Sequence, residues 1–153
     1  MIKQFKEAVA LQPDGIAIYG FPGDAAMRPI INEAREMGIV VTTMNTPLPD
    51  LEAELKTTGF GYAGADLFAA GFNLGKKGVE VCGLEAGDKA FVWGLASMPN
   101  RGERTKGAIA GVESMGVEVV YQEIPDNVNS DASQGTPMYV ATYSANPDIK
   151  MAI

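Results

Sequence analysis

The chain has 153 residues, of which 46% are hydrophobic and 20% charged, and it carries a formal net charge of -7. This length is that of one ordinary domain, and the composition is typical of a globular protein rather than a disordered one. The acidic balance argues against a nucleic-acid partner, because binding phosphates needs clustered Lys and Arg. No apolar run approaches the roughly 18–20 residues that span a bilayer.

The histidine and cysteine content further limits the kinds of catalytic and metal site that the chain can form. The sequence has no histidine, which excludes Ser-His-Asp triads, histidine metal sites and histidine acid–base catalysis. The single cysteine, Cys82, allows no intrachain disulfide and lies in the apolar stretch VEVCGL, where we expect a buried, inert side chain. Residues 1–15 lack an unbroken apolar core and a small-residue cleavage site, so they are not predicted to be a signal peptide.

The first part of the chain alternates helices with short apolar strands. Residues 2–12 have helical spacing, and the run GIAIYG (15–20) predicts a buried parallel strand. Asp24 is expected to cap a second helix that ends at Gly38. Its apolar face is predicted to comprise Met27, Ile30, Ile31, Ala34 and Met37. Further strands are predicted at 39–45 and 60–64, separated by an irregular stretch, 46–58, with at most one short helical turn.

The second part continues the alternation. A helix is predicted from about 67 to 80, followed by strands at 89–95 and 117–124 with a helix at 101–115 between them. A polar loop (125–136), a helix (137–145) and a strand from 148 complete the chain. The face of the 67–80 helix is expected to include Leu67, Ala70, Gly71, Leu74 and Val81. This order predicts an α/β fold of parallel sheets with helices on both faces.

Candidate ligand residues follow from the fold class, because ligands of open α/β sheets bind beyond the carboxyl ends of the strands. Asn45 ends a strand and can both donate and accept hydrogen bonds, although a turn-forming role is equally compatible with its position. Arg104 lies near a helix N-terminus, where the helix dipole disfavours a cation. Two explanations of this position are open. The guanidinium could bind ligand hydroxyls or a carboxylate, or it could simply be solvated. The ligand-binding candidates are Tyr19, Phe21, Asn45, Thr46, Asn100 and Arg104.

Other motifs favour no catalysis, cofactor or metal. GFPGD (20–24) could cradle an anion, but it is neither G-x-G-x-x-G nor a P-loop, and Asp24 would repel a phosphate, so a strand–helix turn is favoured. The acidic run DNVNSD (126–131) lacks the glycine and terminal Glu of an EF-hand loop. The remaining carboxylates considered for catalysis, such as Asp66 and Glu103, lie in different segments and form no pair.

Together these segments resemble the type I periplasmic sugar-binding proteins, the ribose-binding and related substrate-binding components of ABC importers. Residues 11–45 look like that family's central helix–strand–helix–strand stretch, and GYAGAD (61–66) is similar to its first crossover between lobes. Residues 91–116 resemble the strand, loop and Arg-bearing helix of the second lobe, and ANPDIKMAI (145–153) a later run into a strand. The resemblance covers nearly all of the chain.

The resemblance implies a two-lobed fold, with 1–64 in the N-terminal lobe, 65–153 in the C-terminal lobe and a hinge near 64–66. Family members carry further segments before the position of Met1 and beyond that of Ile153. The resemblance therefore implies an incomplete chain, cut short at both ends, which is not expected to bind sugar tightly alone. If so, we expect a homo-oligomer that covers exposed sheet edges.

The resemblance also implies a function: a non-enzymatic, periplasmic protein that binds a small sugar and delivers it to a membrane permease. Asn45 takes the place of a strand-end Asp or Asn that bonds sugar hydroxyls, and Arg104 that of a helix Arg that reaches the ligand. Tyr19 and Thr46 stand where ribose-binding members often have Asn and Arg, so the sugar is not fixed. An aromatic side chain at Tyr19 or Phe21 could stack on a sugar ring.

Two other functions share the predicted fold. The effector domain of a LacI-type repressor has the same architecture, and the absence of a helix-turn-helix does not separate the two. An enzyme on a flavodoxin-like or Rossmann sheet would need a phosphate loop or a nucleophile–base pair, and the sequence offers neither.

Overall fold

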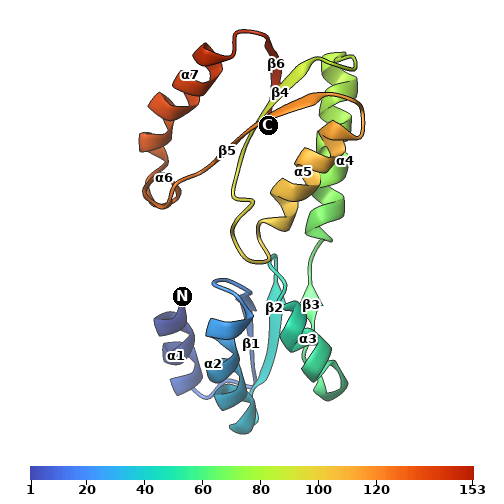
Figure 1. The fold of residues 1–153 in the computed structure, drawn as a ribbon. Helices are drawn as coiled ribbons and strands as arrows, with labels where there is room; N and C mark the ends of the chain where they lie inside the picture. Colours follow the sequence, from blue (N-terminus) through green and yellow to red (C-terminus); the bar gives the residue numbers. More distant parts are fainter. The chain divides into compact units, whose positions relative to one another are not determined.

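The computed structural model describes residues 1–153 and divides the chain into two compact units. Unit 1 comprises Met1–Ala65 and Pro99–Arg101, and unit 2 comprises Asp66–Met98 and Gly102–Ile153. Each unit is built on a three-stranded sheet whose strands all pair in parallel (Figure 1). The predicted α/β class with parallel sheets is confirmed.

Unit 1 has a sheet of strand order β1-β2-β3. Ile16 pairs with Val41 and Thr43 pairs with Tyr62, so the carboxyl ends of the strands lie at one edge. Its elements are α1 (Ile2–Ala10), β1 (Gly15–Tyr19), α2 (Asp24–Glu36), β2 (Val40–Met44), α3 (Pro49–Leu55), the 3-10 helix η1 (Lys56–Thr58) and β3 (Tyr62–Ala63).

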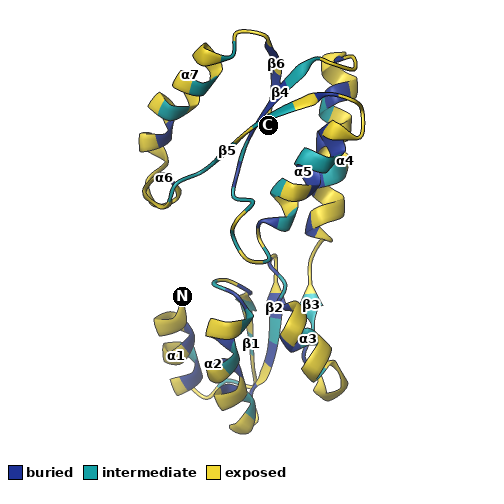
Figure 2. Ribbon diagram, in the orientation of Figure 1, coloured by how far each residue is buried: buried dark blue, intermediate teal, exposed yellow.

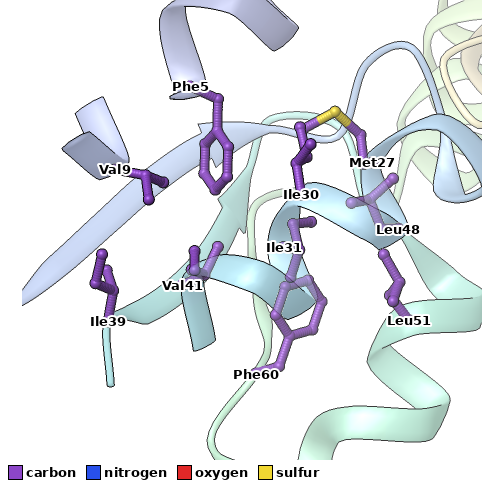
Figure 3. Packing of buried hydrophobic residues seen from close by; sticks show 11 residues of the cluster. Phe5, Val9, Met27, Ile30, Ile31, Ile39, Val41, Leu48, Leu51 and Phe60 are labelled. Atoms are coloured by element: carbon purple, nitrogen blue, oxygen red, sulfur yellow. The ribbon is translucent and has the colours of Figure 1, made fainter. Parts of the chain in front are cut away.

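The core of unit 1 lies on one face of this sheet. Side chains from α1, α2, β2 and the segment around α3 form a single buried cluster: Phe5, Val9, Met27, Ile30, Ile31, Ala34, Ile39, Val41, Leu48, Leu51 and Phe60 (Figure 3). On the other face, Val40 is 62% exposed, and Met44 and Tyr19 are also exposed. Figure 2 shows how burial is distributed over the helices and strands. Strand 15–20 is therefore not buried as predicted, because β1 is an edge strand with helices on one side only.

Three further predictions for unit 1 need correction. Asp24 does not cap α2, since Gly23 occupies the N-cap position; its Oδ1 accepts a hydrogen bond from the Leu51 backbone N at 3.0 Å, in the first turn of α3. Residues 46–58 are largely helical rather than irregular. Pro49 is compatible with this because the first helical residue needs no N–H donor. Met37, expected on the buried face, is 49% exposed just after the end of α2.

Unit 2 has strand order β5-β4-β6 and carries helices on both faces of the sheet (Figure 1). Ala90 packs with Val79 and Val112 on the side of α4 and α5, and the ring of Phe91 lies 5.2 Å from that of Tyr139 in α7. Its elements are α4 (Leu67–Cys82), β4 (Lys89–Gly94), α5 (Glu103–Glu113), β5 (Glu118–Glu123), α6 (Asp126–Ser130), η2 (Ala132–Gln134), α7 (Gly135–Ala145) and β6 (Ile149–Ala152). The predicted loop 125–136 therefore contains two short helices.

Helices α4 and α5 approach each other through glycines. A Cβ at Gly71 or Gly75 would overlap the carbonyl oxygen of Arg104 or Ala108, and Gly107 and Gly111 face the backbone of α4 in the same way. The buried residues of α4 are accordingly Leu67, Gly71, Gly75 and Val79. Such contact brings the two backbones into direct van der Waals range, where Cα–H donors can reach carbonyl oxygens.

This glycine contact corrects part of the predicted apolar face of α4: Leu67 and Gly71 are buried as predicted, but the other members of that face are not. Leu74 is 52% exposed and Val81 is 73% exposed, while Ala70 is also exposed. Cys82, expected to be buried, is exposed at the end of the helix. The prediction followed the large apolar residues, whereas the helix turns its smallest residues toward its partner.

Gly75→Ala should destabilise unit 2 by about 1–3 kcal/mol, because the added methyl group meets backbone that cannot move independently. Gly78→Ala on the same helix is the matched control, since its Cβ would meet the flexible side chain of Met151. Both variants gain the same helix propensity. Urea denaturation measures the difference, and equal stability of the two variants would contradict the backbone-to-backbone packing.

Candidate functional site

The loops after β1 and β2 lie together at the carboxyl edge of unit 1. The Gly20 backbone N donates to the Thr46 carbonyl oxygen at 3.0 Å, and a side chain at Gly20 would overlap that oxygen. Tyr19 and Phe21 are 46% and 37% exposed beside this contact. The structure thus brings four predicted ligand residues, Tyr19, Phe21, Asn45 and Thr46, to one edge, as parallel pairing requires.

Asn45 and Thr46 differ in how accessible they are. Asn45 is exposed, has a left-handed φ of 61° that Asn tolerates better than most residues, and its side-chain amide has no hydrogen-bond partner within the chain. Thr46 is only 4% exposed, and its backbone N and O are both hydrogen-bonded. Asn45 is therefore the residue of this pair whose polar atoms are available to a ligand.

Asn100 belongs to unit 1 and is already engaged there. Its Nδ2 donates to Asp24 Oδ2 and to the Pro47 carbonyl oxygen, each at 3.1 Å, and its φ is 57°. Because the other oxygen of Asp24 holds the first turn of α3, one carboxylate connects α2, α3 and the 99–101 segment. The side-chain carbonyl oxygen of Asn100 remains as its acceptor for a ligand.

Arg104 lies in unit 2, on the first turn of α5, and is exposed without an ion pair or hydrogen bond of its side chain. Its guanidinium is thus available to hydroxyl or carboxylate oxygens.

Unit 2 has a polar cluster at its carboxyl edge that the sequence did not indicate. Glu123 accepts from the Oγ of Ser97 at 2.7 Å and from the Tyr121 hydroxyl, which itself accepts from the Ala96 N at 2.9 Å. Alternation along β5 places Tyr121 and Glu123 on the same face. The two residues looked like ordinary polar positions of a strand, and only the fold brings residues 96 and 97 to them.

The same contacts shift the pKa values of both side chains. Burial would raise the pKa of Glu123, but hydrogen bonds from Tyr121 and Ser97 outweigh it and hold the pKa below its ordinary value of 4.5. Burial, and then the hydrogen bond to Glu123, raises the pKa of Tyr121 to about 12. The carboxylate therefore persists below pH 4.5, and its contribution to stability is lost as the pH falls through the lowered pKa.

A cavity of about 400 Å³ lies in unit 2 near the carboxyl ends of β4 and β5. The rings of Trp93 and Tyr139 line it with their centroids 5.8 Å apart, and Asn129 and Thr136 add polar atoms. Sequence reasoning missed this cavity because α6 and η2 were predicted to be a loop. Aromatic faces beside a few polar groups suit a small ring that carries hydroxyls.

The sequence pattern of the periplasmic binding protein domain matches residues 1–153, and the chain belongs to this family. Its fold is accordingly the type I α/β architecture of solute-binding proteins of sugar ABC transporters, as the resemblance predicted. A search of curated protein sequences gave no match. None of the helices is both long and apolar enough to cross a membrane.

Solved structures show the same fold. An ABC transporter solute-binding protein from Burkholderia multivorans matches with a TM-score of 0.78 at 21% identity, over 99% of this chain and 52% of that one. A glucose-galactose binding protein from Geobacillus stearothermophilus matches with a TM-score of 0.74 at 25% identity, over 97% and 49%. A periplasmic solute-binding protein from Actinobacillus succinogenes 130z, with bound D-allose, gives 0.77 at 23%, over 97% and 50%. The chain thus spans about half the length of these proteins.

Asn100→Ala should lower the free energy of unfolding by about 1–3 kcal/mol, because it leaves Asp24 and the Pro47 carbonyl without their shared donor. Asn100→Asp should be worse at neutral pH, since a second carboxylate would then face Asp24. Asn32→Ala, at an exposed position of α2, is the control. Urea midpoints at pH 7 compare them, and an Asn100→Asp variant as stable as the parent would refute the assignment.

Proposed function

We propose that this chain, although it spans about half the length of these proteins and was expected to bind sugar poorly alone, binds a small sugar as the solute-binding part of an ABC-type carbohydrate importer. The observation that carries the proposal is the family match over residues 1–153. The glucose-galactose and D-allose binding proteins named above support it as structural neighbours. Each unit also presents polar side chains beside exposed or half-buried aromatic rings at its carboxyl edge. A sugar needs this combination, because it has hydroxyls around its rim and apolar ring faces.

The residues proposed to contact sugar fall into two groups. Asn45 and Arg104 have unengaged polar groups and are assigned to hydroxyls, Asn45 as donor and acceptor and Arg104 as donor. Tyr19 and Phe21 are assigned to the apolar face of the ring. Thr46 and Asn100 have secondary roles: Thr46 ties the two loops of unit 1 together through its backbone, and Asn100 offers one carbonyl oxygen.

The family also suggests the setting in which the chain works. We infer that units 1 and 2 are the family's two lobes, with a hinge near residues 64–66; the unit boundary between Ala65 and Asp66 supports this. The proposed partner is a membrane permease, and the proposed location is the periplasm. No catalytic role is proposed, because the sequence has no histidine and its candidate carboxylates lie in separate elements.

Asn45→Ala and Arg104→Ala should each weaken sugar binding by about 1–3 kcal/mol, or roughly 5- to 150-fold, because each orphans a sugar hydroxyl. Calorimetric titration with D-glucose, D-galactose and D-allose measures this, with Asn32→Ala as a surface control. A parent protein that binds none of these sugars would contradict the proposed function. Binding that both variants retain in full would contradict the site.

We further propose that the isolated chain self-associates. The open edge of β1 and the exposed Val40 and Met44 present hydrogen-bonding groups and apolar area on the same sheet of unit 1. Burying that area against a second copy stabilises association by roughly 25 cal/mol per Å². A two-fold dimer is the simplest arrangement.

Sedimentation velocity of the parent and of Val40→Lys tests this proposal. The parent should sediment as a dimer at micromolar concentration, and the variant should shift toward monomer, because a charge on the buried face opposes association. A parent that stays monomeric at all concentrations would rule out the dimer.

A further inference from the structure

Side chains of neighbouring elements accept hydrogen bonds from the loop that follows β4. Three consecutive backbone amides of this loop are engaged in turn. The Leu95 N donates to Thr105 Oγ1 at 3.1 Å and the Ala96 N to the Tyr121 hydroxyl at 2.9 Å. The Ser97 N donates to Glu123 Oε2 at 3.3 Å, and its Oγ donates to Glu123 Oε1 at 2.7 Å.

The three amides and the three side chains that bind them all belong to unit 2, so this arrangement is independent of where unit 1 lies. Thr105 comes from α5, and Tyr121 and Glu123 come from β5, the neighbour of β4 in the sheet. The Tyr121 hydroxyl both accepts from Ala96 and donates to Glu123, which makes the two strand residues one connected unit. A charged acceptor at Glu123 strengthens these hydrogen bonds relative to neutral ones.

We propose that Tyr121 and Glu123 are positioning residues, which fix the 95–98 loop and with it the first turn of α5 that presents Arg104 to the sugar. Residues 99–102 connect the loop to this turn, and the Thr105 hydroxyl, next to Arg104 in sequence, accepts a hydrogen bond from the first amide of the loop, that of Leu95. A loop that is ordered before the ligand arrives costs less to bind, since its conformational entropy is already lost. This inference rests on the proposed sugar-binding function for the role of Arg104.

The test combines amide hydrogen exchange with sugar titration in the parent, Glu123→Ala, Glu123→Gln and Tyr121→Phe. Glu123→Ala should speed exchange of the Ser97 amide roughly tenfold and weaken sugar binding by a similar factor, because the loop loses its acceptor. Glu123→Gln keeps one carbonyl oxygen as an acceptor and should retain most of the protection of the Ser97 amide and most of the sugar affinity. Tyr121→Phe should act mainly on the Ala96 amide, which loses its acceptor while the ring stays in place.

Glu113→Gln, on an exposed position of α5, is the matched control and should change neither readout. Exchange at residues 95–97 within twofold of the parent in both Glu123→Ala and Tyr121→Phe would overturn the inference. So would faster loop exchange with unchanged sugar affinity, or exchange that rises equally along β4 and the loop. A parent that binds no sugar contradicts the proposed function instead, and the exchange data then still decide whether these side chains hold the loop.

Discussion

Parallel pairing is the constraint on which the candidate site depends. Because β1 pairs with β2 and β4 with β5 in parallel, the loops that follow these strands leave each sheet at one edge. Residues far apart in sequence thus become neighbours without any local signal: residue 20 meets 46 in unit 1, and 96 meets 121 in unit 2. Antiparallel pairing would send alternate loops to opposite edges and disperse these groups.

The candidate ligand residues also require that the helices next to these loops are held in fixed positions. In unit 2, the close glycine contact fixes α5 against α4, and α5 in turn carries both Arg104 and the hydroxyl of Thr105. In unit 1, the carboxylate of Asp24 ties the start of α3 to Asn100. Backbone packing and a few shared acceptors therefore set the local geometry at the carboxyl edge of each unit, and the exposed side chains there have unengaged polar groups.

The sequence predicts the order of strands and major helices well, because the spacing of apolar residues and the turn-forming residues are local signals. Prediction from the sequence fails where the burial or the hydrogen bonds of a residue depend on a partner that is distant in the chain. The exposed Leu74 follows from the glycines of α5, and the bond of Asn100 to Asp24 spans 76 positions. The short helices α3 and α6 were missed because their lengths carry little periodic signal. Tyr121 and Glu123 look like ordinary strand residues until the 96–97 segment is placed beside them.

Amide chemical shifts test most directly whether the carboxyl edges of the two sheets bind sugar, as proposed. Titration of the isotopically labelled chain with D-galactose, D-glucose or D-allose should move the amides of Asn45, Thr46, residues 95–98 and residues 100–104. Gly38 and Gly87, in the turns that enter β2 and β4 at the opposite edges, should not move. Shifts centred on those two turns, or no shifts with any of the three sugars, would contradict the account.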